Sequence, residues 1–217
     1  MICVIPCLAW AGRPFFTDDA GLTTAGKCQL ESWIQVNHDA RDVWAVPACN
    51  PTGNFEVSLG INYLQTDQQQ DMKSILLQGK TLFKELKTNS WGVGFAAGIL
   101  RSGTHSNSAD FAYVPLSISM LDDDVMLHVN LGWLRDHASS SNRTTWGMGA
   151  EYALLPNTSY FIEAFGDDVQ KPLWHSGLNI AILPERMHLN LTYGRNLALA
   201  EQGNFYSVGL NFYAIPW

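Results

Sequence analysis

The strongest constraint on the fold is a hydrophobic period of two that recurs along almost the whole chain. From Phe55 to Tyr63, large apolar residues occupy every second position, and Glu, Ser, Gly and Asn lie between them. The stretches Val125–Trp133, Met187–Tyr193 and Tyr206–Phe212 repeat this arrangement. Because successive side chains of a β-strand point to opposite faces, the pattern predicts strands with one apolar and one small-or-polar face.

The alternating segments predict an all-β fold of about twelve antiparallel strands. Most have roughly the 9–11 residues of a tilted strand that crosses a membrane. Proline removes a ladder donor, so Pro47 and Pro115 inside two of these segments leave ten strands as the alternative. The predicted strands are Lys27–Asn37, Asp42–Cys49, Phe55–Gln65, Met72–Phe83, Trp91–Leu100, Asp110–Leu121, Val125–Arg135, Thr144–Leu154, Thr158–Phe165, Pro172–Leu183, Met187–Arg195 and Phe205–Ala214.

The predicted connections alternate between short and long. Four of the five even-numbered ones, such as Asp122–Asp124 and Pro184–Arg186, are tight turns rich in Pro, Asp, Asn and Gly. The others, such as Arg101–Ala109, are longer and rich in Ser, Asn, Gln and Asp. Outer-membrane barrels have short periplasmic turns and longer extracellular loops. The sequence therefore predicts an up-and-down transmembrane β-barrel in a Gram-negative outer membrane, with both ends of the barrel domain in the periplasm.

The composition favours a membrane barrel over a soluble one. Charged residues make up 15% of the chain, against about 25% in an average soluble domain. The polar faces carry few Lys or Glu, which suits a narrow wet lumen better than a solvated surface. Membrane lipids would then cover the apolar faces. The net charge of −7 without a basic run argues against nucleic acid as a partner, and the lack of about 18 consecutive apolar residues argues against a transmembrane helix.

The N-terminal residues are predicted to be the remnant of a secretory signal peptide. Met1–Ala11 is apolar and ends in Ala-Trp-Ala, which resembles a signal-peptidase site. The alternative is that this run forms a buried strand. Residues 12–26 are expected to hang in the periplasm or to plug the lumen, and residues 27–217 to form a single barrel domain.

The last predicted strand resembles the C-terminal signal of outer-membrane barrels, which makes the barrel-assembly machinery an expected partner. It combines Gly209 with aromatic residues at Tyr206, Phe212 and Tyr213. Aromatic residues also gather near other strand ends, as in the belts at membrane interfaces. The expected belt residues are Trp91, Phe111, Trp133, Trp146, Tyr160, Trp174, Tyr193, Phe205 and Tyr206.

One part of the chain resembles a known family. Arg13–Gly21 reads Arg-Pro-Phe-Phe-Thr-Asp-Asp-Ala-Gly, and Gly26–Glu31 reads Gly-Lys-Cys-Gln-Leu-Glu. Together with the Glu-Val-Ser-Leu-Gly of Glu56–Gly60, these segments resemble the opening of a family of outer-membrane proteins named for the meta-pathway of phenol degradation. Members of that family are often labelled transporters. The resemblance spans about Pro14–Gly60 and implies a barrel and solute passage, without a substrate or catalytic residues.

Polar residues in one phase of the strands define a candidate conduit. If the even-numbered residues of Phe55–Gln65 face the lumen, Glu56, Ser58 and Asn62 line it. The same reasoning adds Glu31, Trp33, Gln35, Lys80, His128, Asn130, Glu151, Glu163, His175, Asn179, His188, Asn190 and Asn211. The carboxylates give this lining an acidic bias, which favours neutral or cationic solutes. The alternative is a set of hydrogen bonds and ion pairs that fills a narrow barrel.

The leading interpretation is an outer-membrane channel or transporter for the passive passage of small solutes. No cofactor is expected. No metal site is expected either, because His128, His175 and His188 come from separate strands without matching carboxylate or cysteine spacing. A plugged structural or binding barrel without transport is one alternative.

A lipid-modifying hydrolase is the second alternative. Outer-membrane phospholipases need a serine nucleophile beside a histidine base. The pairs His105-Ser106 and His175-Ser176 offer these residue types, but sequence neighbours seldom form a catalytic pair, and the Asn-Gly-Arg signature of the phospholipase is absent. The sequence therefore favours a channel over an enzyme.

Two cysteines suggest a cross-strand disulfide. Cys28 and Cys49 lie at the open base of the first predicted hairpin. If the turn is centred between His38 and Asp39, these two cysteines face each other. The alternative is a pair of lipid-facing thiols.

Overall fold

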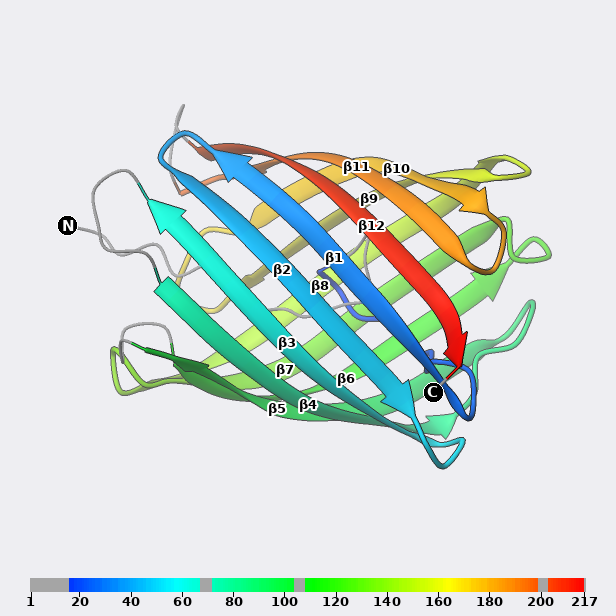
Figure 1. The fold of residues 1–217 in the computed structure, drawn as a ribbon, viewed down its shortest axis with the longest axis horizontal. Helices are drawn as coiled ribbons and strands as arrows, with labels where there is room; N and C mark the ends of the chain where they lie inside the picture. Colours follow the sequence, from blue (N-terminus) through cyan, green and yellow to red (C-terminus); the bar gives the residue numbers. More distant parts are fainter. Residues whose placement is uncertain (1–15, 67–71, 104–107, 199–202, 217) are drawn as a thin grey trace.

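The chain folds into a closed barrel of twelve antiparallel strands (Figure 1). A computed structural model describes residues 16–66, 72–103, 108–198 and 203–216, so the predicted signal peptide lies outside the described residues. The strands are β1 Lys27–Asn37, β2 Ala40–Asn50, β3 Phe55–Thr66, β4 Met72–Lys84, β5 Trp91–Ser102, β6 Ala109–Met120, β7 Val125–Asp136, β8 Ser141–Leu155, β9 Thr158–Asp167, β10 Leu173–Leu183, β11 Met187–Asn196 and β12 Asn204–Pro216. The predicted fold class and strand count are confirmed.

Each strand pairs with its neighbours in the sequence, and the barrel closes where β1 pairs with β12. Glu31 of β1 lies opposite Asn211 of β12 on one side and opposite Val46 of β2 on the other. This closure leaves no unpaired sheet edge, which is the condition for strands to cross a membrane. Among the described residues, no helix has the length and apolarity needed to span a bilayer.

The two prolines weaken single ladders without removing a strand. Around Pro47, the pairs Ala45–Ile61 and Ala48–Ser58 keep one register between β2 and β3. The ladder between β5 and β6 likewise continues past Pro115 without a shift. A missing donor therefore costs local hydrogen bonds, and the apolar alternation on both sides keeps the register.

The two faces of the barrel differ as the alternation predicts. Ile61, Leu131 and Val208 point outward and are 59%, 63% and 53% exposed. Their neighbours in the sequence, Asn62 and Asn130, are buried inside. The outer wall is thus an apolar surface that lipid would cover, whereas the inner wall carries most of the buried polar side chains.

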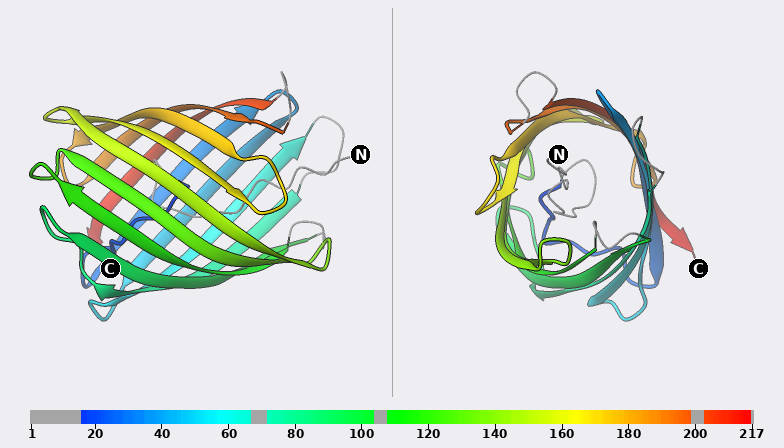
Figure 2. Two further views of the ribbon diagram at one scale, coloured as in Figure 1. Left: turned by 180° about the vertical axis from the view of Figure 1, so that it is seen from behind. Right: turned by 90° about the vertical axis from the view of Figure 1, so that its left-hand side faces the viewer.

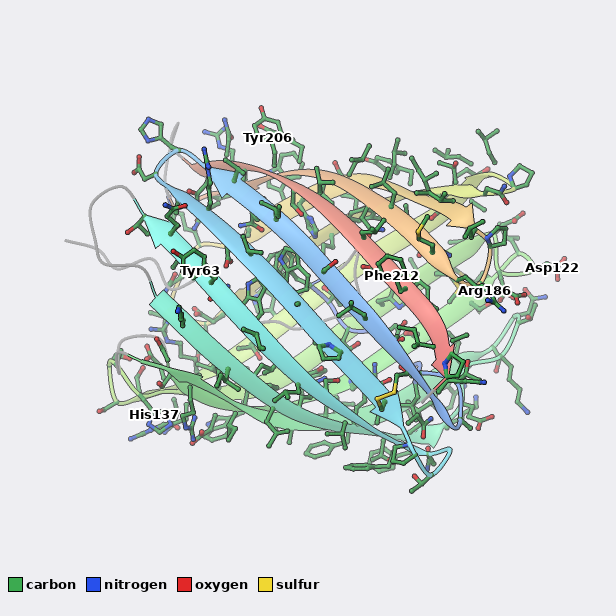
Figure 3. All side chains as sticks on the ribbon, viewed as in Figure 1. Tyr63, Asp122, His137, Arg186, Tyr206 and Phe212 are labelled. Carbon is green, nitrogen blue, oxygen red and sulfur yellow. A yellow bond between two sulfur atoms is a disulfide. The ribbon has the colours of Figure 1, made fainter. Side chains whose placement is uncertain are left out.

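The expected aromatic belt is correct only in part. Trp174 packs edge-to-face on Tyr193, which contacts Tyr206 at a tilt, and Tyr206 projects outward near the long-loop end (Figure 3). Phe111 and Phe205 are instead buried in the barrel, being 4% and 3% exposed, so their assignment to the belt is wrong. They occupy inward positions of their strands. Whether a ring faces lipid depends on the alternation of side chains, not on how close the residue lies to the strand end.

Candidate functional site

The site is organised by residues 16–26, here called the lumen segment, which lie inside the ring of strands (Figure 2). The segment continues into β1 at the short-turn end of the barrel and reaches inward as far as β9. Its backbone therefore contacts walls that are more than a hundred residues away in sequence. Of the two locations expected for residues 12–26, the described part occupies the lumen.

A buried ion pair holds the middle of the lumen segment. The Lys80 ammonium of β4 donates to Asp18 at 2.8 Å and to Asp19 at 3.2 Å. The Tyr113 hydroxyl of β6 donates to the second Asp18 oxygen at 2.6 Å. With its amide oriented to satisfy both partners, Asn130 of β7 donates to the Asp18 carbonyl oxygen and accepts from the Asp18 amide. Three strands thus hold one aspartate through its side chain and its backbone.

A second anchor holds the first described residues of the lumen segment. The Glu163 carboxylate of β9 accepts from the amides of Phe16 at 2.5 Å and Thr17 at 2.7 Å. His175 of β10 pairs with the same carboxylate, and both side chains are fully buried. The Phe16 ring stacks on Phe165 with ring centroids 4.7 Å apart. At this corner of the lumen, a carboxylate accepts from the backbone of the segment and an aromatic ring packs against Phe16.

A glycine in the wall makes room for the lumen segment. A Cβ atom at Gly147 of β8 would lie 2.5 Å from Thr17 Oγ1 and 3.3 Å from Thr17 Cβ. A contact of 2.5 Å essentially never occurs at a real Cβ atom, so any side chain at this wall position would force Thr17 to shift.

Two more wall residues accept backbone amides of the lumen segment. Ser117 of β6 accepts from Ala20 at 2.8 Å, and Glu56 of β3 accepts from Thr23 at 2.7 Å. The Asn50 amide of β2 donates to the Thr23 carbonyl oxygen at 2.8 Å. Side chains of the wall thus replace the backbone partners that a strand or helix would give these groups.

A chamber of about 380 Å³ lies between the lumen segment and the wall, in the half of the barrel next to the short turns. Its wall carries the carboxylates of Glu31, Glu56 and Glu151, and the lumen segment adds Asp18 and Asp19. The remaining lining is mainly amide, hydroxyl, imidazole and aromatic groups. The chamber is therefore rich in negative charge and able to hold a small polar molecule.

A second hollow, of about 580 Å³, continues the acidic lining toward the short turns. It shares Met126 and Glu151 with the chamber and adds the charged residues Lys87, Asp123 and Asp124. Hydrogen bonds from the hydroxyls of Ser119 and Thr88 lower the pKa of Asp123. They favour the ionised form of this carboxylate at the edge of the second hollow.

The inner wall toward the long loops carries a buried apolar cluster built from β1, β2 and β4 to β7. Trp33 stacks on Trp44 with ring centroids 5.6 Å apart, and both are buried among Leu76, Leu100 and Phe111. The alternation identified strand faces but did not show that apolar residues also occupy the inner phase of β2, β4 and β5. The lumen is therefore polar at the short-turn end and largely apolar on this wall nearer the loops.

The family of the chain follows from its sequence. The pattern of the family described as "Uncharacterised conserved protein UCP029691" matches residues 4–213. The chain belongs to this family. No curated protein sequence matches the chain significantly. The narrower resemblance to the phenol-degradation family, carried by residues 14–60, is not established by this match.

Solved structures show which fold this family member shares. The KdgM porin has 10% sequence identity and a TM-score of 0.69, over 85% of this chain and 98% of that one. The NanC porin has 13% identity and a TM-score of 0.60 over 85% and 98%. The COG4313 outer-membrane channel from Pseudomonas putida F1 has 10% identity and a TM-score of 0.63 over 89% and 97%. At these identities the likeness establishes the outer-membrane barrel fold alone.

The predicted lumen residues of this family member occupy inward positions of their strands. Gln35, Glu151, Asn179 and His188 are partly buried. The others are buried: Glu31, Trp33, Glu56, Ser58, Asn62, Lys80, His128, Asn130, Glu163, His175, Asn190 and Asn211. The structure joins some of them in networks, such as the amide chain in which Asn211 donates to Asn190 and Asn190 donates to Asn179.

Other important residues are not among the predicted lumen residues. Tyr113 and Ser117 contact the lumen segment directly, and Gln78 accepts a hydrogen bond from the Tyr113 hydroxyl. The alternation of the sequence could have identified them, since each lies at an inward position of a predicted strand. Only the position of the lumen segment shows which inward residues act together.

The predicted pair His175 and Ser176 does not place a serine hydroxyl beside a histidine base. His175 points inward and pairs with Glu163. Ser176 follows it on the strand, so its side chain points to the opposite face. The second pair, His105 and Ser106, lies outside the described residues.

Cys28 and Cys49 are register partners in the β1–β2 ladder, and their sulfurs are bonded. The bond joins the first two strands near the short-turn end of the barrel (Figure 3). It therefore ties β1, which also forms the closing seam with β12, to its neighbour β2.

Proposed function

We propose that this protein is a channel of the bacterial outer membrane for the passive passage of small neutral or cationic solutes, narrowed by its own N-terminal segment. The observation that carries the proposal is the acidic chamber inside a closed barrel whose outer face is apolar. A soluble barrel would place its apolar face inward, and here lipid is the natural partner of the outer face. On this proposal, β12 carries the signal for the barrel-assembly machinery.

The charge of the lining supports the choice of solute. Among the described residues, the lining of the chamber carries five carboxylates and one ammonium group, that of Lys80. Rings of carboxylates favour cations and disfavour anions in narrow pores. The KdgM porin has also been solved in complex with disordered oligogalacturonate, which is an acidic sugar chain. The acidic chamber of this family member would repel such a chain, so we propose a different class of solute.

Planar-bilayer recording tests the proposal. The purified protein should conduct in small steps, and its reversal potential in a salt gradient should show cation selectivity. Deletion of residues 12–22 should raise the conductance, since it removes the Phe16 and Asp18 anchors and keeps the hydrogen bonds of Thr23. A folded barrel that stays silent with and without the deletion would contradict the channel and favour a binding barrel.

A further inference from the structure

The outer face of the barrel carries a cluster of charged side chains at the long-loop end. Arg101 lies on β5, Asp110 on β6 and Arg135 on β7, and His137 directly follows β7. These four residues, here called the rim cluster, occupy outward positions, since the residues next to them in the sequence, such as Leu100, are buried inside. Figure 3 shows His137 at this end of the barrel.

One carboxylate orients the rim cluster. Asp110 accepts from the Arg101 guanidinium at 2.6 Å, and its other oxygen lies 3.0 Å from Nε2 of His137. The same guanidinium donates to the backbone carbonyl oxygens of Leu100 and Ala109, both at 2.9 Å. These three hydrogen bonds fix its position and leave two of its five N–H donors unused among the described residues. The Arg101 side chain is still 46% exposed, so it can meet a ligand.

Arg135 adds a second positive charge to the rim cluster. Its guanidinium has no hydrogen bond or ion pair with another described residue. Asp110 is its register partner but uses its carboxylate for Arg101 and His137. The adjacent Asp136 points inward and is buried. The two loops that border the cluster, residues 103–108 and 137–140, contain no Asp or Glu. Without His137, the cluster therefore holds two guanidinium groups and one carboxylate.

The rim cluster lies at the depth expected for lipid headgroups. On the same face of β7, Leu131 and Trp133 precede Arg135 and are 63% and 45% exposed. Tryptophan is enriched at the membrane–water interface, and two residues of a strand cover about 7 Å. The Arg135 guanidinium therefore lies just beyond the apolar band. At the opposite end of β6 and β7, the short turn carries Asp122–Asp124, which would repel an anionic headgroup.

The chemistry of the rim cluster suits phosphate. Guanidinium groups bind phosphate through paired N–H donors, which gives short and strong hydrogen bonds. Arg101 and Arg135 lie two strands apart, which is about 10 Å, so a headgroup with more than one phosphate can meet both of them at once. The long loops of outer-membrane barrels face the outside, where the outer leaflet consists of glycolipids with phosphates on a disaccharide.

We propose that the rim cluster is a binding site for a phosphorylated glycolipid of the outer leaflet. Arg101 and Arg135 hold its phosphates, and its acyl chains lie along the apolar outer wall that includes Leu131. Asp110 is a positioning residue, because it orients Arg101 and His137. The proposal rests on the outer-membrane location of the proposed function and is independent of conduction.

Native mass spectrometry of the purified full-length protein in detergent tests the site, with lipid A that carries two phosphates as the probe. We expect a saturable one-to-one complex. The double variant Arg101→Gln/Arg135→Gln should bind about a hundredfold more weakly, at about tenfold for each guanidinium. Arg186→Gln is the matched control, since it removes an exposed arginine at the opposite end of the barrel (Figure 3) and should leave the affinity unchanged.

The single variant Arg135→Gln keeps the test decisive if the double variant does not fold. Its side chain makes no hydrogen bond or ion pair within the described barrel, so the substitution should leave the fold intact and weaken binding about tenfold. Equal affinity of the parent and Arg135→Gln, or an equal loss in Arg186→Gln, would overturn the site. Each variant is first checked for the heat-dependent gel shift of a folded barrel.

Three comparisons identify the ligand. Lipid A without its phosphates should bind far more weakly than the intact lipid, and equal binding of the two would reject phosphate recognition. Equal binding of phosphatidylglycerol would reject the glycolipid, and complete displacement by inorganic phosphate at equal concentration would assign the site to free phosphate. Lipid A binding to a barrel that never conducts would uphold the site and reject only the channel, whereas conductance without such binding would do the reverse.

Discussion

The Lys80 ammonium of β4 lies 2.8 Å from an Asp18 carboxylate oxygen, and the two side chains are only 5% and 3% exposed. This contact joins the wall of the barrel to a segment that precedes the first strand. It is the most deeply buried of the contacts between an aspartate and a lysine or arginine among the described residues. Removal of one partner would leave the other charged and buried, and that cost makes the pair a holding point for the lumen segment.

The substitution Lys80→Met is expected to free the lumen segment. Breaking a buried ion pair on one side costs about 3–5 kcal/mol, which corresponds to at least a hundredfold increase in the detached population. A cysteine at position 20, where Ala20 is fully buried, should then react with a thiol reagent that it resists in the parent protein. Lys73→Met is the control, because Lys73 is an exposed residue of the same strand. Equal protection of the cysteine in both variants would contradict the role of Lys80.

The substitution Glu163→Gln is expected to loosen the first described residues of the lumen segment. Its carboxylate accepts from two backbone amides and pairs with His175, and one amide oxygen cannot satisfy all three. Hydrogen bonds to charged groups contribute about 1.5–3 kcal/mol, so amide exchange at Phe16 and Thr17 should accelerate by about 10- to 100-fold. Hydrogen-exchange mass spectrometry would measure this. Unchanged exchange beside an intact β-sheet spectrum would count against the anchor.

The substitution Gly147→Val is expected to displace Thr17 from the wall. The added side chain would occupy the space of the Thr17 Oγ1 and Cβ atoms, so the segment has to shift. We expect faster exchange at Thr17 and a higher bilayer conductance. Gly103→Val offers a comparison, since a Cβ atom at Gly103 meets no atom of the described residues within 4 Å. If both variants conduct like the parent, steric displacement of the segment does not control the pore.

The pairing of Cys28 with Cys49 predicts an oxidised protein. Intact mass spectrometry without reductant should give a mass lower by two hydrogens than the reduced form, and two free thiols would contradict the bond. The double variant Cys28→Ala/Cys49→Ala should lose about 2–4 kcal/mol of stability, because the closed loop no longer limits the unfolded chain. The temperature of the heat-dependent gel shift would report the loss. The single variants should behave like the double variant.

The strands and their phase could be predicted because both are local properties. In β3, for example, the alternation from Phe55 to Tyr63 marks the inward residues without knowledge of any partner strand. The hairpin register at Cys28 and Cys49 follows from one turn position. The aromatic belt was wrong at Phe111 and Phe205, since proximity to a strand end says nothing about which face a ring occupies.

The lumen segment could not be placed in the same way. The stretch that contains Asp18 has no alternation, and a periplasmic or a luminal position fitted it equally well. Its partners Lys80, Ser117 and Glu163 lie on β4, β6 and β9, and no local pattern links them to residues 16–26.

The sequence by itself determined that the chain forms about twelve antiparallel strands with an apolar outer face, because a period of two acts on each strand separately. It also identified which polar residues share the inner face. Only the tertiary structure decided that residues 16–26 lie in the lumen, that Lys80 pairs with Asp18, and that Glu31 and Glu151 line one chamber. These relationships arise when the barrel closes, since closure brings strands far apart in sequence around a common space.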